Sequence, residues 1–125
     1  MTTNNLNAST KYKYEFYIGC NDKDTKKDNS ALILQRVQLY FLNLFGFYSM
    51  QVMHGAYTHQ EEFDAGDIFG NKRDYHTVVC EKTCKIELIL DDKLYDLELI
   101  CASLKDLCNQ ESILVTCTKV NGGLF

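Results

Sequence analysis

The chain repeats one order of elements twice: a strand, a charged break, an amphipathic helix and a second strand. The first copy runs from Tyr12 to Tyr57 and the second from about Val78 to Lys119. Two such units within 125 residues predict one α+β domain, because each unit must bury its apolar faces against the other. We therefore expect a ferredoxin-like βαββαβ sandwich, in which two helices cover one face of a four-stranded antiparallel sheet.

Hydrophobic periodicity gives the bounds of the expected elements. Alternating apolar and polar residues predict strands at 12–20, 50–57, 78–90 and 112–118. Apolar steps of three and four predict a helix at 31–45, stopped by Gly46, and a second helix capped by Asp91 or Asp92. The single domain then spans 12–119 and includes a long hairpin loop at 58–76, with a flexible arm at 1–11 and a tail at 120–125.

The bulk composition disfavours some classes of protein. A net charge of −4 argues against a protein that coats duplex DNA, which needs a basic face. No apolar run reaches the roughly 20 residues of a membrane span, and the polar residues 1–11 lack the apolar core of a signal peptide. We therefore expect a cytoplasmic protein, in the host-cell cytoplasm if a phage encodes it, with neither duplex DNA nor a membrane as a partner.

The six cysteines are expected to stay reduced in that compartment. Cys101 and Cys108 lie on the apolar face of the second helix, and Cys80 and Cys84 share one face of the third strand. These positions favour core packing, with metal or disulfide use as the alternative. Cys80 and Cys84 are roughly 13 Å apart along a strand, which is too far for them to chelate one zinc ion together.

Two helices on one face leave the other face of the sheet uncovered. That face is expected to mix apolar and polar residues: Tyr17, Val79, Thr83, Leu114, Thr116 and Thr118. A face of this kind often pairs with its twin, so the sequence predicts a homodimer or a larger homo-oligomer. A solvated face is the alternative.

The densest polar cluster, NDKDTKK at 21–27, stands between the first strand and the first helix. Loops before helix N-termini supply backbone N–H groups and a positive potential for anions. Three lysines add donors for phosphate, and two polar residues can orient a ribose or a base: Lys23, Lys26, Lys27, Asn21 and Thr25. A solvated charged turn is the alternative.

Three residues outside this cluster are candidates for the same ligand. Lys82 interrupts the apolar face of the third strand, so it needs a partner such as Glu111 or a ligand phosphate. Tyr57 is expected to stack a base, and His59 is expected to donate an orienting hydrogen bond. A polar network that ties the ends of the third and fourth strands is the alternative for Lys82.

The histidines allow a different chemistry. His54, His59 and His76 stand near acidic residues of the 58–76 segment, where two of them could form an acid–base pair or a metal site. Surface histidines in a hairpin are the favoured interpretation, so no residue is assigned a catalytic or metal-binding role.

Several segments resemble a family of small phage and bacterial βαββαβ proteins, most of them uncharacterised. The shared signatures read YIGCNDKDTKK at 17–27, GAYTH at 55–59, EKTCKIELI at 81–89 and LCNQESILV at 107–115. The resemblance covers most of residues 12–119, while the arm and the extended loop are additions in this chain. By a looser analogy of size and fold, phages encode compact oligomeric proteins that sequester cyclic nucleotide immune signals.

The chain contains no nucleophile elbow, P-loop, HExxH, paired CxxC or dinucleotide fingerprint. The first hypothesis is therefore a phage-type anti-defence protein that sequesters a small anionic cyclic nucleotide without cleaving it, using no cofactor. One alternative is a small histidine-dependent phosphodiesterase or lyase that degrades such a nucleotide. The other is an inhibitor or adaptor that binds a host protein through the open sheet face or the long loop.

Overall fold

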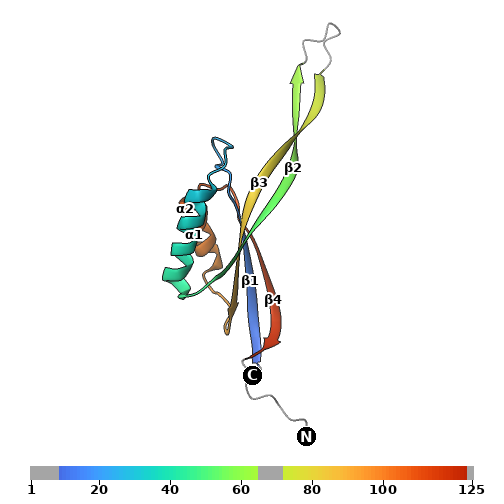
Figure 1. The fold of residues 1–125 in the computed structure, drawn as a ribbon. Helices are drawn as coiled ribbons and strands as arrows, with labels where there is room; N and C mark the ends of the chain where they lie inside the picture. The colour runs from blue at the N-terminus through green and yellow to red at the C-terminus, as the bar shows by residue number, and fades with distance from the viewer. Residues whose placement is uncertain (1–8, 65–71, 124–125) are drawn as a thin grey trace.

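The computed structural model describes residues 9–64 and 72–123, with the backbone alone for 57–64 and 72–79. Its elements are β1 (Ser9–Gly19), α1 (Ser30–Phe45), β2 (Ser49–Asp64), β3 (Lys72–Leu90), α2 (Leu97–Cys108) and β4 (Leu114–Gly122). The sheet order is β2-β3-β1-β4, and each neighbouring pair of strands is antiparallel. Both helices lie on the same side of the sheet (Figure 1). The predicted ferredoxin-like βαββαβ arrangement is confirmed.

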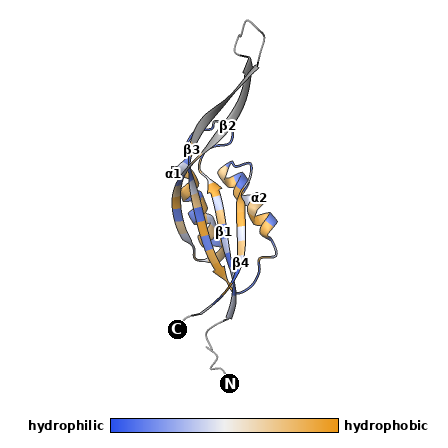
Figure 2. Ribbon diagram, turned by 90° about the vertical axis from the view of Figure 1, so that its right-hand side faces the viewer, coloured by the Kyte–Doolittle hydropathy of each residue, from blue (hydrophilic) through white to orange (hydrophobic). Residues whose placement is uncertain are grey.

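The hydrophobic core lies between the sheet and the helices. Each of the two repeats contributes one central strand and one helix to it. The buried core residues are Tyr14, Phe16 and Ile18 from β1, Cys20 directly after β1, Ile33, Val37 and Phe41 from α1, Cys84, Ile86 and Leu88 from β3, and Ile100, Leu104 and Cys108 from α2. Figure 2 shows hydrophobic residues along the body of the sheet and on both helices. The alternation in β1 and β3 and the helical steps of three and four therefore place these residues in the core.

β2 and β3 form a longer hairpin than predicted. Their residue pairs run from Ser49 with Glu87 to Asp64 with Lys72, whereas β1 stops pairing with β3 at Gly19. Beyond that point β2 and β3 continue as a two-stranded ribbon that projects from the body (Figure 1). The prediction of a loop at 58–76 is therefore wrong for 58–64 and 72–76, and 65–71 lie outside the described residues. In these segments β2 and β3 remain paired although their residues are largely polar and do not alternate between apolar and polar, so the sequence pattern did not indicate a strand.

The two outer ends of the sheet also extend further than predicted. β1 begins at Ser9 and β4 ends at Gly122, and these two residues are paired with each other. Residues 9–11 are therefore strand and not arm, and 120–122 are strand and not tail. The pairing of the two strands supplies hydrogen bonds that the polar sequence of each end does not reveal.

The helix ends agree with the sequence in one case and differ in another. Gly46 ends α1 as predicted: its φ is 82°, and its N–H donates to the Leu42 carbonyl at 2.9 Å. α2 begins later than predicted, at Leu97, with Asp96 at the N-cap position instead of Asp91 or Asp92. The N–H of Leu94 donates to the Tyr14 hydroxyl at 2.9 Å, which ties the preceding segment to β1 before the helix begins.

All six cysteines are free thiols. Cys84 and Cys108 are buried, so the predicted core packing is confirmed for these two, and Cys20 is buried as well. Core packing is wrong for Cys80, and Cys101 is only partly buried. Cys80 and Cys117 are exposed. Cys80 faces the same side as Cys84, but it precedes Thr83, the first residue of β3 that pairs with β1, so only β2 and β3 are paired at Cys80.

Candidate functional site

A polar cleft lies at the end of the sheet where β1 ends and β4 begins. Its volume is about 340 Å³, at the lower end of the range for small-molecule sites. The lining residues come from segments far apart in the sequence: Tyr17, Gly19, Asn21, Asp22, Lys23, Lys26, Glu81, Thr83, Gln110, Glu111, Ser112 and Leu114. The strand residues among them alternate with the buried ones, so the cleft opens on the sheet face that the helices leave uncovered.

The loop 21–28 is held in place by the residue that follows α2. Asp22 accepts hydrogen bonds from the Asn109 side chain at 2.7 Å and from the N–H groups of Asp24 and Thr25, each at 2.9 Å. These hydrogen bonds, with that from Asn109 contributing most, lower the pKa of Asp22 to about 2. The Asp22 carboxylate therefore stays charged, and its hydrogen bonds fix the shape of the cleft wall.

Two acceptor oxygens converge above Gly19. A methyl group built on Gly19 would lie 2.5 Å from Glu81 Oε1 and 3.0 Å from Gln110 Oε1. The Gln110 side-chain nitrogen donates to the carbonyls of Asn21 at 2.7 Å and Cys108 at 3.2 Å, so its oxygen is left to face the cleft. Two acceptors that face one point are stabilised by a cation or by a hydrogen-bond donor between them.

The floor of the cleft is apolar. Tyr17 of β1 and Leu114 of β4 are directly paired across the two strands and face the same side of the sheet. Leu114 is 63% exposed, which is a high value for a leucine on a sheet. The Tyr17 hydroxyl donates to Glu15 at 3.1 Å, and this hydrogen bond holds the ring in place. An aromatic ring beside an exposed leucine is a suitable surface for a flat base.

The cleft carries charges of both signs. Asp22, Glu81 and Glu111 contribute carboxylates, and Lys23 and Lys26 contribute ammonium groups. Three carboxylates around a cleft of this size repel a ligand with several phosphates, because their charges act over a few ångströms. A zwitterionic or cationic small molecule complements this arrangement better.

The structure brings together three of the residues predicted to bind a ligand: Asn21, Lys23 and Lys26 all line the cleft. Lys26 has a φ of 62°, and its N–H donates to the Asp22 carbonyl at 2.9 Å. Thr25 and Lys27 come from the same loop but line a separate shallow pocket. The loop therefore divides the predicted cluster between two surfaces.

Lys82 lies away from the cleft. Its side chain has the facing of the buried Cys84, on the helix side of the sheet, and its ammonium group lies 3.8 Å from the Asp28 carboxylate. Its partner is therefore Asp28 and not Glu111, which lines the cleft on the other face. His54 is exposed and lines the same shallow pocket as Lys82.

The remaining predicted residues fall on the ribbon. Tyr57 and His59 belong to β2 and His76 belongs to β3, and the side chains of all three lie outside the described residues. Their roles in stacking, orienting or catalysis stay predictions.

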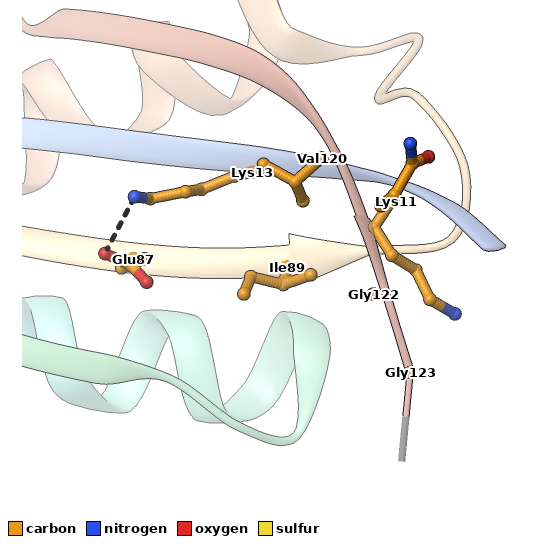
Figure 3. A pocket seen from close by; sticks show the side chains of 8 residues that line it. Lys11, Lys13, Glu87, Ile89, Val120, Gly122 and Gly123 are labelled. Atoms are coloured by element: carbon orange, nitrogen blue, oxygen red, sulfur yellow. Dashed lines mark ion pairs between the residues drawn. The ribbon is translucent and has the colours of Figure 1, made fainter. Parts of the chain in front are cut away.

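A larger groove of about 730 Å³ lies at the opposite end of the same sheet face. Figure 3 shows Ile89, Val120 and two glycines lining it together with Lys11 and Lys13. Both lysines are paired within the chain, Lys11 with Asp91 and Lys13 with Glu87 at 3.9 Å. The groove offers few polar groups for a ligand, so we take the smaller polar cleft as the candidate site.

Several residues of the cleft were not predicted to bind the ligand, and Glu81 and Gln110 are the two whose oxygens converge. Both stand in short polar junctions that the sequence suggested as a structural network. The order of the strands could have linked these two residues. In a βαββαβ sheet, the end of β1 lies beside the start of β4 and beside the residues of β3 where its pairing with β1 begins. Polar residues at these three positions therefore meet.

Across residues 9–56 and 80–123, no group of three or more His, Cys, Asp or Glu side chains is arranged to hold a metal ion. Neither described helix has the length and apolarity needed to cross a membrane.

No family model and no curated protein matches this chain. Its fold is similar to that of a solved structure described as a phage SAM lyase in complex with S-methyl-5′-thioadenosine. The TM-score is 0.52 at 14% sequence identity, and the similarity covers 91% of this chain and 90% of that chain. The two proteins therefore share an overall fold along nearly their whole length.

Proposed function

We propose that the protein binds S-adenosylmethionine, or a closely related sulfonium nucleoside, in the cleft and removes it by cleavage. The observation that carries the proposal is the convergence of Glu81 and Gln110 oxygens above Gly19 in a cleft with charges of both signs. The similar solved structure supports it, because that protein is described as a SAM lyase and its ligand is a nucleoside thioether.

The groups of the proposed ligand match the groups of the cleft. The adenine would rest on Tyr17 and Leu114, which form the apolar floor. The positively charged sulfonium and the ribose hydroxyls would face the acceptors of Glu81 and Gln110. The carboxylate of the methionine part would lie near Lys23 or Lys26 at the edge.

Cleavage of such a ligand demands little from the protein. When the bond between sulfur and the γ-carbon breaks, its electron pair goes to sulfur, and the neutral thioether S-methyl-5′-thioadenosine leaves without a proton. The γ-carbon is taken by an oxygen nucleophile, either the ligand's own carboxylate, which gives a lactone, or water, which gives a hydroxy amino acid and a proton. The protein then contributes by holding the ligand in a bent conformation in which nucleophile and carbon are close.

The proposal is tested by incubating the full chain with S-adenosylmethionine and separating the products by chromatography. We expect S-methyl-5′-thioadenosine to accumulate with time. The variant Glu81→Gln keeps the size of the side chain but removes its charge, so kcat/KM should fall at least about 30-fold. Lys27→Ala is the matched control, because Lys27 lies on the separate pocket and its loss should leave kcat/KM within about twofold.

A second candidate function is sequestration of a small cyclic nucleotide, the hypothesis from the sequence. The observation that favours it is the group of exposed lysines on the loop, Lys23, Lys26 and Lys27, which can donate to phosphate. In this case the ligand would lie over the loop and touch both of its pockets. Lys26→Ala and Lys27→Ala together should then weaken nucleotide affinity at least tenfold.

One assay separates these candidates. The protein is mixed with S-adenosylmethionine or with a panel of cyclic nucleotides and filtered, and the retained fraction is heated and analysed. Conversion of S-adenosylmethionine supports the lyase, and intact release of a cyclic nucleotide supports sequestration. If S-adenosylmethionine is recovered unchanged and unbound, the first proposal is wrong.

A further inference from the structure

The outer face of α1 is almost without charge. Of its 16 residues, Arg36 is the one charged residue, and it donates to the Leu107 carbonyl at 2.8 Å, so its guanidinium points toward α2. The side of α1 that faces away from the core instead exposes Leu32, Leu39 and Leu42, which are 38%, 53% and 45% exposed. A helix that is apolar on its outer side as well as its inner side is typically buried on both sides.

α2 serves as an internal comparison. It lies on the same side of the sheet, but it carries Glu98, Lys105 and Asp106 in only 12 residues. A charged outer surface is the usual condition of a helix in contact with water. The lack of charge is therefore a property of α1 and not of the helix layer in general.

The spacing of the exposed leucines favours a helix as the partner. Leu32 and Leu39 are seven residues apart, and Leu42 follows three residues later. Steps of seven and three place side chains on one line along a helix, which is the pattern that packs into the grooves of another helix.

We propose that this face of α1 packs against the same face of a second copy of the chain across a two-fold axis. The residues beside the leucines support self-pairing: Gln35 and Asn43 are exposed, and each carries an amide that both donates and accepts hydrogen bonds. In a two-fold interface residue i of one copy meets residue j of the other and j meets i, and two amides can satisfy both contacts because each one donates and accepts. A row of like charges could not do so.

The interface extends toward β2, which is an edge strand because it pairs with β3 alone. Phe47 precedes this strand and is 47% exposed, and Val52 lies on its helix side and is 36% exposed. A stable interface buries about 800 Å² of each partner, which is more than three leucines supply. Phe47 and Val52 extend the apolar surface beyond α1, and the exposed polar residues around them add to the area that a partner can cover.

This inference goes beyond the proposed function, since α1 and the cleft lie on opposite sides of the sheet. It also names a different surface from the open sheet face, through which the sequence predicted an oligomer. That face contains ion pairs within the chain, such as Lys85 with Glu15 at 2.7 Å and Lys13 with Glu87 at 3.9 Å. Charged groups that are already paired leave less surface for a partner than the uncharged face of α1.

The test is the mass of the full chain in solution, measured by sedimentation equilibrium over a range of concentrations. We expect the wild-type chain to be a dimer and Leu39→Glu/Leu42→Glu to be a monomer, with the dissociation constant raised at least about 30-fold. The control is Leu99→Glu, which places the same charge on the exposed Leu99 of α2 and should leave the dimer intact. Circular dichroism of each variant checks the fold, and the milder Leu39→Ser replaces the double variant if that one does not fold.

Three results would overturn the proposal. The first is a wild-type monomer at about 100 μM, and the second is an oligomer that survives both α1 variants, which would place the contact on another surface. The third is a monomer that sediments with neutral phosphatidylcholine vesicles through the same leucines, which would assign this face of α1 to lipid.

Discussion

The Asn109 side chain donates a hydrogen bond to the Asp22 carboxylate at 2.7 Å, although 87 positions separate the two residues. Asp22 lies in the loop between the strand and the helix of the first repeat, and Asn109 follows the helix of the second. One wall of the cleft is therefore built by a contact between the two repeats. The cleft forms only when both halves of the chain have packed.

The first prediction concerns pH and follows from Asp22. Its pKa is lowered from 3.8 to about 2 in the folded protein, mainly by the hydrogen bond from Asn109. Because the folded-state pKa lies below the unfolded one, the charged carboxylate stabilises the fold above about pH 4, and this contribution is lost as the pH falls toward 2.

Urea unfolding of the wild type and Asp22→Asn measures this effect. The wild type should have the higher midpoint at neutral pH, and the two midpoints should converge between about pH 4 and pH 2. Equal midpoints at neutral pH would show that the hydrogen bonds to Asp22 do not stabilise the fold.

The second prediction concerns Gly19. In Gly19→Ala the new methyl group would meet Glu81 Oε1 at 2.5 Å and Gln110 Oε1 at 3.0 Å, so both side chains must move. We expect affinity for the cleft's ligand to fall at least tenfold in calorimetric titration with S-adenosylmethionine, with little change in the melting temperature. Gly122→Ala is the control, because its methyl group would meet nothing within 4 Å. Unchanged affinity in Gly19→Ala would remove these two side chains from the binding site.

The third prediction concerns thiol reactivity. Burial raises the pKa of Cys84 to about 12 and that of Cys108 to about 11, so few thiolates form at either position. Cys80 and Cys117 are exposed and should react with iodoacetamide at about pH 8 at least a hundredfold faster than the buried pair. Mass spectrometry of digested samples gives the rate for each cysteine, and unfolding in guanidinium should make the rates similar. Rapid labelling of Cys84 in the native protein would contradict its position in the core.

The fourth prediction concerns the core. Phe16 is fully buried and its ring lies 5.1 Å from that of Phe41, centroid to centroid, across the interface of β1 and α1. Phe16→Ala should lower the free energy of unfolding by about 3–5 kcal/mol, because it leaves a cavity where strand and helix meet. Tyr95→Ala removes a side chain that is 98% exposed and should change that free energy by less than about 0.5 kcal/mol. Chemical denaturation of both variants gives the comparison, and similar values would place Phe16 outside the core.

Some of the structure could be read from local patterns. The alternation around Phe16 places β1, the steps of three and four through Val37 place α1, and Gly46 marks the end of that helix. Each of these three features depends on residues close together in the sequence, so its pattern can be recognised in a short stretch of the chain. The order of the two repeats then predicts the βαββαβ sheet, because few arrangements can bury both sets of apolar faces.

The site required more than local patterns. The sequence pointed to Asn21, Lys23 and Lys26, but it grouped them with Lys27, which the turn of the loop sends to another pocket. Lys82 was grouped with them as well, and the pleat of β3 places it on the opposite face. Glu81 and Gln110 were not predicted to bind the ligand.

The sequence alone thus determined which faces of the strands and helices are buried, since burial follows the local period of apolar residues. Tertiary structure alone decided that Glu81 and Gln110 face one point above Gly19, and that Asn109 holds the loop of Asp22. Glu81 and Gln110 lie 62 and 91 positions from Gly19 in the sequence, and Asn109 lies 87 positions from Asp22. Such contacts leave no period in the sequence, because they depend on the register in which the strands pair.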